Sequence, residues 1–158
     1  MKRTFQTENL NVLEHGYLVW KYYQKLLNND LDGMKIPDWF HLHKDTILQN
    51  LLPKDIIETY TIYHDIGKVE CLVIDELGKR HFPNHASHSE NIWLSLEGDP
   101  LIAKLMGLDM VFHTEDYNKI NNRMLNYNII LTLILAALAE LHANASMFGG
   151  ITSESFCI

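Results

Sequence analysis

The sequence is poor in the residues and segments that mark several classes of protein. Its 158 residues include only two cysteines, Cys71 and Cys157, which are too few for a disulfide framework, so we expect reduced thiols in a cytoplasmic protein. Four prolines and eight glycines exclude a low-complexity or collagen-like chain. The N-terminal MKRTFQTENL has no apolar core, so we expect no signal peptide. The longest apolar run, Ile129 to Ala139, contains Thr132 and is too short to cross a membrane.

Basic residues are also scarce. Thirteen Lys and Arg stand against twenty Asp and Glu, which gives a formal net charge of −7. Proteins that bind extended duplexes through the phosphates carry a basic face, so we expect no such partner here. The charge is compatible with a small anionic substrate or with one end of a nucleic-acid strand. The length and the 47% hydrophobic content are those of one domain with its own core.

Apolar periodicity predicts a mainly α-helical fold for this single domain, residues 1–158. We expect about five core helices with one small β-hairpin, and no parallel sheet. Helices are predicted over about 8–29, from Pro53 to Gly67, from Ser87 or Ser89 through Leu96, from Asp99 through Phe112, and over about 126–147. The remaining segments are a loop with a short helix near 45–52 (31–52), the hairpin (69–84) and an extended C-terminal tail (149–158).

Two acidic residues occupy positions that a helix does not favour. Asp65 lies in the last predicted turn before Gly67, where a carboxylate opposes the helix dipole. Glu140 lies in an almost wholly apolar helix, where burial is costly unless the carboxylate is paired or bound to a metal. Asp109 and His113 are four residues apart, which indicates either a helix-stabilising pair or two ligands aimed at one point. Local conflicts of this kind often mark functional sites.

Several histidines lie where an imidazole could bind a metal, although each also has a structural explanation. His15 falls on the core-facing stripe of the first helix, where a histidine is more often a satisfied core residue. His64 lies near a helix C-terminus, where it stabilises the dipole. His85 and His88 lie at the start of a helix, where a charged imidazole gains nothing and a neutral, ligand-type ring is favoured.

The order of these residues resembles that of the HD-domain superfamily of metal-dependent phosphohydrolases, over nearly the whole chain. In that family a histidine on the first helix, an adjacent His-Asp pair and an aspartate on the last helix bind a divalent metal. HDIGK, residues 64–68, is a common form of the second element. NHASHS resembles the family's His-Glu-x-x-x-Ser stretch, with Ala86 in place of the glutamate. HFPNHA is most similar to HD proteins of the tRNA nucleotidyltransferase type and of RNA end repair.

The resemblance implies a site for one or two divalent ions. Its metal ligands would be His15, His64, Asp65, His85, Asp109, His113 and Glu140. Asp65 would bridge a first ion to a second one held by His85 and His113. The last ligand departs from the family pattern, because Glu140 stands where an aspartate is usual, with Asn144 or Asp109 as other oxygen donors. Mixed imidazole and carboxylate ligands suit Mn, Fe, Co, Ni or Zn better than Mg or Ca.

The resemblance also implies a function for the residues around the metal. Asp65 and Lys68 are the expected catalytic residues, and His88 and Asn144 are further candidates for substrate contact. Lys68 follows Gly67 and can either turn toward a phosphate or lie on a solvated helix end. The expected reaction is hydrolysis of a phosphomonoester or phosphodiester in a nucleotide or at a nucleic-acid end.

Two other functions stay open. The altered last ligand favours a catalytically weakened HD domain that binds nucleotides as a regulatory module. A plain helical interaction module would have to explain Asp65 and Glu140 separately. The sequence leaves open the ester, the metal and the oligomeric state.

Overall fold

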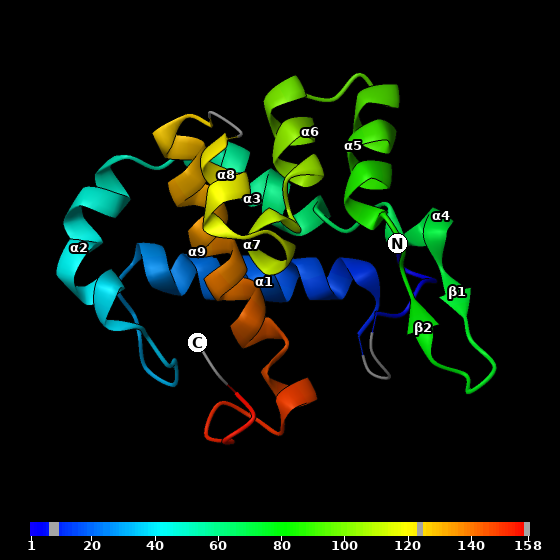
Figure 1. Cartoon of the computed structure of the whole chain (residues 1–158), viewed down its shortest axis with the longest axis horizontal. Coiled ribbons are helices and arrows are strands. Elements are labelled where there is room, and N and C mark those ends of the chain that lie inside the picture. Colours follow the sequence, from blue (N-terminus) through cyan, green and yellow to red (C-terminus); the bar gives the residue numbers. More distant parts are fainter. Residues whose placement is uncertain (7–9, 123–124, 157–158) are drawn as a thin grey trace.

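The chain folds into a mainly helical bundle with one small antiparallel hairpin, as the sequence predicts (Figure 1). This computed structural model describes residues 1–6, 10–122 and 125–156. The helices are α1 (Val12–Leu27), α2 (Asp38–Gln49), α3 (Lys54–Tyr63), α4 (Lys68–Cys71), α5 (His85–Ser95), α6 (Pro100–Gly107), α7 (Val111–Thr114), α8 (Tyr117–Asn122) and α9 (Tyr127–Ala143), followed by the 3-10 turn η1 (Ala145–Phe148). The hairpin pairs β1 (Val73–Ile74) with β2 (Arg80–His81). Within the described part of the chain, each helix is too short or too polar to cross a membrane.

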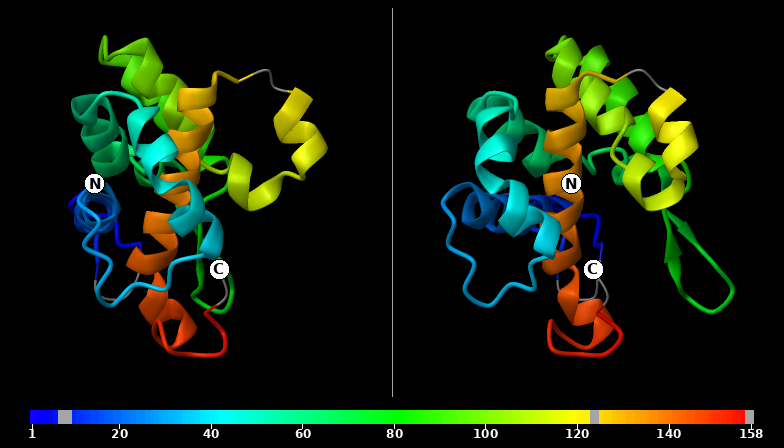
Figure 2. Two further views of the ribbon diagram at one scale, coloured as in Figure 1. Left: turned by 90° about the vertical axis from the view of Figure 1, so that its left-hand side faces the viewer. Right: turned by 60° about the vertical axis from the view of Figure 1, so that its left-hand side comes forward.

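Helix α9 forms the centre of the bundle, and the other long helices lie around it (Figure 2). Its residues from Ile129 to Ala143 are mostly buried, so it is apolar nearly all round, as expected of a central helix. Helix α1 packs against both α9 and α3. A Cβ atom on Gly16 would collide with the backbone of Ile62, so glycine allows the close approach of α1 to α3. His15 directly precedes Gly16 on α1, so this contact brings the C-terminal end of α3 next to His15.

The start of α1 is fixed by its own residues. The side chain of Asn11 accepts hydrogen bonds from the backbone N–H groups of Leu13 and Glu14, and Glu14 accepts one from the N–H of Asn11. This reciprocal capping box fixes the first turn of α1. The predicted start at Glu8 lies outside the described residues, as does Cys157. The other cysteine, Cys71, is a buried free thiol.

Helices α5 and α6 pack side by side and close one side of the bundle (Figure 1). Asp99 caps α6 and Pro100 is its first residue, as predicted. The predicted cap of α5 by Ser87 or Ser89 is wrong, because the cap is Asn84 in the left-handed region. The buried hydroxyl of Ser89 instead accepts a hydrogen bond from the backbone N–H of Gly67 at 2.9 Å. Ser89 thereby holds the turn that carries Asp65.

Several predicted boundaries are wrong. The second helix of the bundle, α2, is twelve residues long and begins at Asp38, instead of being short and near 45–52. Helix α3 ends at Tyr63, so His64 is its C-cap and Asp65 lies in the following turn. Residues 68–71 form the helical turn α4, and the two strands span only 73–74 and 80–81, so the hairpin is shorter than the predicted 69–84.

The C-terminal end of the chain also differs from the prediction. Helix α9 ends at Ala143, and η1 follows it, so the predicted single helix over about 126–147 is interrupted. Residues 151–155 form turns instead of an extended tail. They bring Phe156 back against the bundle, where it is buried. Packing of this one aromatic ring explains why the tail folds back.

Candidate metal centre

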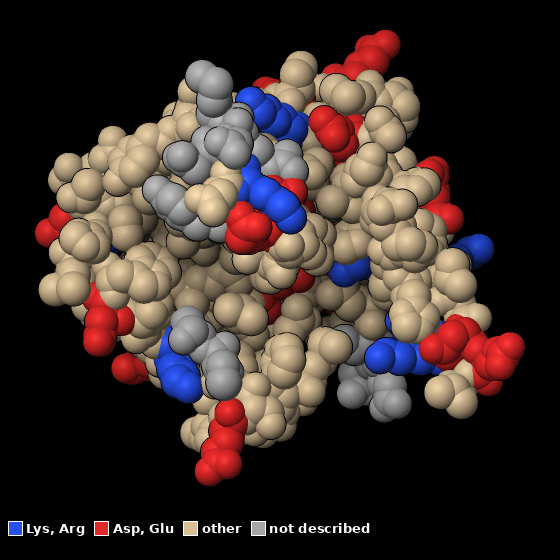
Figure 3. All heavy atoms as spheres, in the orientation of Figure 1, with Lys and Arg blue, Asp and Glu red and all other residues tan. Residues whose placement is uncertain are grey.

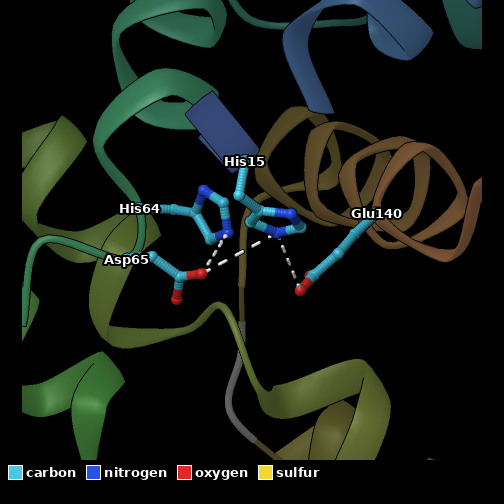
Figure 4. Close-up of side chains that lie close together, drawn as sticks. All are labelled: His15, His64, Asp65 and Glu140. Carbon is cyan, nitrogen blue, oxygen red and sulfur yellow. Dashed lines mark ion pairs between the residues drawn. The ribbon is translucent and has the colours of Figure 1, made fainter. Parts of the chain in front are cut away.

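Four side chains from three helices converge in the middle of the bundle (Figure 4). His15 comes from α1, His64 from the C-cap of α3, Asp65 from the turn that follows α3, and Glu140 from α9. Nε2 of His64 lies 3.2 Å from Oδ2 of Asp65. Nε2 of His15 lies 3.8 Å from that oxygen and 3.8 Å from Oε1 of Glu140. Two atoms that bind one ion at about 2.1 Å lie about 3.0 to 4.2 Å apart, so these distances suit a shared metal.

Several polar atoms of this group are buried and lack hydrogen bonds. Both ring nitrogens of His15, Nε2 of His64 and Oδ1 of Asp65 are inaccessible to solvent and have no hydrogen-bond partner among the described residues. Each such atom costs about 1–3 kcal/mol when its hydrogen bond to water is not replaced. A bound cation would satisfy the atoms that face one another. The residues therefore fit a divalent metal by the chemistry of their donors as well as by distance.

The histidines present the correct nitrogen to the site. Nδ1 of His64 lies 2.8 Å from the carbonyl oxygen of Thr61, so it donates to that oxygen, and Nε2 is the nitrogen that faces Asp65 and would bind an ion after losing its proton. His85 repeats this arrangement, with Nδ1 3.0 Å from the carbonyl of Phe82 and Nε2 3.4 Å from Oδ1 of Asp65. A backbone carbonyl on the far nitrogen is the usual way in which proteins orient a metal-binding imidazole.

A second group of possible ligands shares Asp65 and adds His85 and Asp109. Asp109 lies in the turn between α6 and α7 and is buried. Its Oδ1 accepts a hydrogen bond of 2.5 Å from the hydroxyl of Tyr60, while Oδ2 has no partner in the described part of the chain. The fourth member of the group formed by His15, His64 and Asp65 is Glu140 and not Asp109.

The spacing of Asp109 and His113 left two interpretations open, a helix-stabilising pair or two ligands aimed at one point, and the structure supports neither. Nε2 of His113 lies 3.5 Å from Oε2 of Glu140, whereas Asp109 groups with Asp65 and His85. The reason is a break in the predicted helix: α6 ends at Gly107 and α7 begins at Val111, so a spacing of four is not one helical turn here. His113 therefore supports Glu140 and does not join the second group.

The charges of the group stabilise one another. Burial raises the pKa of Asp65, but the positive charges of His64 and Lys68 outweigh burial and hold it well below its usual range. Burial lowers the pKa of His64, but the carboxylates of Asp65 and Asp109 outweigh that and raise it to about 10. Burial also raises the pKa of Glu140, while the rings of His113 and His15 hold it below its usual value. Without a metal, the group therefore holds a proton on His64 and negative charge on Asp65 and Glu140.

Lys68 is part of this group. Its side chain is 8% exposed, and Nζ lies 2.6 Å from Oδ2 of Asp65. Nζ also donates to Oε1 of Gln6 at 3.1 Å and lies 5.4 Å from the centre of the Phe82 ring. The solvated helix-end lysine, which the sequence left open, is thereby excluded.

A cavity of about 390 Å³ lies beside His15, His64, Asp65 and Glu140, which we call the metal group. Its lining includes Lys68, His85, Glu140 and Asn144, so the predicted Asn144 does lie at the site. His88 does not line it: its ring is 44% exposed, and Nδ1 lies 3.6 Å from the carboxylate of Glu70. A separate, almost wholly apolar cavity of about 440 Å³ between α2 and α9 contains none of the candidate residues.

Sequence reasoning missed the polar residues Gln6, Tyr60, Arg80 and His81 of the site. Tyr60 precedes His64 by one helical turn, but the same spacing is common for a core tyrosine and carries no separate signal. Gln6, Arg80 and His81 lie on a terminal segment and on a hairpin, whose placement depends on tertiary packing.

Comparison of this chain with family models, with curated proteins and with solved structures gave no match. The resemblance to HD domains therefore depends on the motif residues of the sequence. The candidate metal centre depends on the convergence of His15, His64, Asp65 and Glu140.

Proposed function

We propose that this chain is a metal-dependent phosphohydrolase of the HD type that acts on small phosphate esters, such as nucleotides or nucleic-acid ends. One observation carries the proposal: the side chains of His15, His64, Asp65 and Glu140 meet in the core, and Nε2 of both His15 and His64 is buried there without a hydrogen bond among the described residues. A packed core normally pairs its buried polar atoms, so these exceptions require an explanation. A divalent metal explains them together.

The chemistry of phosphate esters fits such a centre. A divalent ion bound there would neutralise phosphate oxygens and lower the pKa of a water molecule. His15, His64, Asp65 and Glu140 would hold the ion, and the carbonyls of Thr61 and Phe82 would orient the rings of His64 and His85. Imidazole and carboxylate donors favour Mn, Fe, Co, Ni or Zn.

The neighbouring cavity supports a small anionic substrate. Its wall carries two cationic side chains, those of Lys68 and Arg80, in a chain of net charge −7. Apolar groups complete it, from Phe82 and Met110 among others. Its volume of about 390 Å³ lies within the range of roughly 300–1,000 Å³ that is usual for small-molecule sites.

The surface charge gives no support to duplex binding. On the face drawn in Figure 3, Lys and Arg are scattered among Asp and Glu, and the described residues form no continuous basic area there. A protein that follows a nucleic-acid backbone needs such an area. A terminal phosphate or a free nucleotide needs only the few cations at the cavity.

Metal analysis of the purified protein, followed by a hydrolysis screen with Mn, Co, Ni and Mg, tests the proposal. The substrates should include 5′-nucleotides, cyclic nucleotides and RNA ends with a 2′,3′-phosphate. Bound transition metal with turnover is the expected result. Metal without turnover would favour the regulatory module, and absence of both would favour the plain helical module.

A further inference from the structure

We infer that Asn84 recognises the base of a nucleotide whose phosphate lies at the metal group, in a second cavity at the start of α5. The inference rests on the proposed function and identifies the part of the site that would select nucleotides over other phosphate esters. This second cavity, which we call the α5 cavity, has a volume of about 410 Å³. That volume lies within the range of roughly 300–1,000 Å³ that is usual for small-molecule sites.

The α5 cavity adjoins the cavity of about 390 Å³ beside the metal group. Phe82, His85 and Met110 line both cavities. Nε2 of His85 lies 3.4 Å from Oδ1 of Asp65, so this shared wall reaches the metal group. A substrate with its phosphate beside Lys68 can therefore extend past the shared wall into the α5 cavity.

Asn84 brings an amide without a protein partner to the α5 cavity. It lines the cavity as the N-cap residue of α5, but its side chain makes no hydrogen bond to any described residue. Its φ of 55° lies in the left-handed region, which glycine adopts at lower cost. Asn29 has the same backbone conformation, with a φ of 54°, but its Oδ1 accepts a hydrogen bond from Nζ of Lys44 at 3.3 Å. The amide of Asn84 is thus available to a ligand, whereas that of Asn29 is used within the chain.

An amide beside an aromatic ring suits a nucleobase. The asparagine amide donates one hydrogen bond and accepts another, and adenine offers the matching acceptor and donor at N7 and N6. Phe82 provides a ring on which a base can stack, and Met110 adds a polarisable apolar side chain. Nζ of Lys68 lies 5.4 Å from the centre of the Phe82 ring. The phosphate and the base of one nucleotide therefore meet complementary groups around Phe82.

Two ligands that differ in the base test this inference. Adenosine 5′-monophosphate and ribose 5-phosphate share the sugar and the phosphate, so the ratio of their dissociation constants measures the contribution of the base. Isothermal titration calorimetry of the metal-free full chain measures both constants without interference from hydrolysis. Asn84→Gly removes the amide and tolerates the left-handed backbone, and Asn84→Asp keeps the size but loses the donor. Asn29→Gly is the matched control, because it removes an asparagine of the same backbone conformation after the end of α1.

We expect wild type and Asn29→Gly to bind adenosine 5′-monophosphate about 5- to 150-fold more tightly than ribose 5-phosphate, the range expected for one amide–base pair. In Asn84→Gly and Asn84→Asp the ratio should fall toward one. A wild type that binds both ligands equally or does not bind the nucleotide, or an unchanged ratio in Asn84→Gly, would overturn the inference. Hydrolysis by a wild type that does not distinguish the two ligands would contradict only this inference, whereas base-dependent binding without hydrolysis would contradict only the proposed reaction. Circular dichroism confirms that each variant is folded, and Asn84→Asp decides if Asn84→Gly is not.

Discussion

Two buried histidines lie along α9, His142 near its C-terminal end and His15 beside Glu140. They differ in whether their ring nitrogens have hydrogen-bond partners. His142 is 1% exposed; its Nδ1 donates to the carbonyl of Leu138 at 2.7 Å, and its Nε2 accepts from the N–H of Lys35 at 3.0 Å. His15, beside Glu140, is equally buried, yet neither of its ring nitrogens has a hydrogen-bond partner among the described residues. Burial alone therefore does not identify a metal ligand. The better indication is a group of possible ligand atoms that face one another and lack hydrogen bonds.

The largest expected effect comes from removing the His-Asp pair. His64→Ala and Asp65→Ala should each abolish metal binding and hydrolysis while the fold is retained. Loss of even an indirect partner of a metal ligand lowers affinity about 10- to 100-fold, so loss of a ligand should lower it by more than about 100-fold. Metal titration and turnover with the best substrate measure this. The control is His41→Ala, an exposed histidine of α2, which should bind metal normally. Full activity in either site variant would refute the site.

His15→Leu separates metal binding from stability. Leucine has a similar size and removes two buried nitrogens without hydrogen bonds, which offsets the loss of the ring beside Glu140, so the metal-free protein should be about as stable as wild type. Metal at 100 times its dissociation constant should raise the free energy of unfolding of wild type by about 2.7 kcal/mol and that of the variant by almost nothing. Denaturant titration with and without metal measures both values. Equal stabilisation of the two proteins would show that His15 is not a ligand.

His142→Leu should have the opposite pattern. The substitution leaves the backbone N–H of Lys35 and the carbonyl of Leu138 without their partner, which should cost about 1–3 kcal/mol in the free energy of unfolding. Metal binding should be unchanged, because His142 faces Phe156 and Tyr22 instead of the metal group. Reduced metal affinity in a folded His142→Leu protein would contradict the division of α9 into two regions.

The smallest expected effect is the release of about one proton on metal binding at pH 7. The raised pKa of His64, about 10, means that its ring carries a proton in the metal-free protein, and a ligand nitrogen must lose it. Affinity should therefore rise with pH up to about 10. The same raised pKa stabilises the metal-free fold below pH 6.5, and this stability is lost as the pH rises through 10. Calorimetry in buffers of different ionisation enthalpy counts the protons, and no release would show that His64 is neutral or unbound.

Much of the fold could be predicted because periodic apolar residues specify long helices. Helices α1 and α9 follow from such patterns, and Asp99-Pro100 gives the start of α6. Helix α2 could not be predicted at its true length, because it buries only Phe40 and Ile47 and so has a sparse apolar face. Residues 69–71 were predicted to be extended but belong to the helical turn α4, which also places Lys68 against Asp65.

The site could be predicted where a residue conflicts with its local surroundings. Asp65 and Glu140 stood out because a carboxylate is unfavourable at a helix end or in an apolar helix, and the structure brings both to the metal group. Tyr60 and Gln6 could not be identified, because no local conflict marks them and their contacts join distant segments. The separation of Asp109 from His113 depends on a helix break, which their spacing does not reveal.

A crystal structure of the protein soaked with zinc, with anomalous diffraction at the zinc edge, tests the central claim most directly. We predict a single strong peak within about 2.0–2.2 Å of Nε2 of His15, Nε2 of His64 and carboxylate oxygens of Asp65 and Glu140. A peak elsewhere on the protein, or none between these four side chains, would contradict the account.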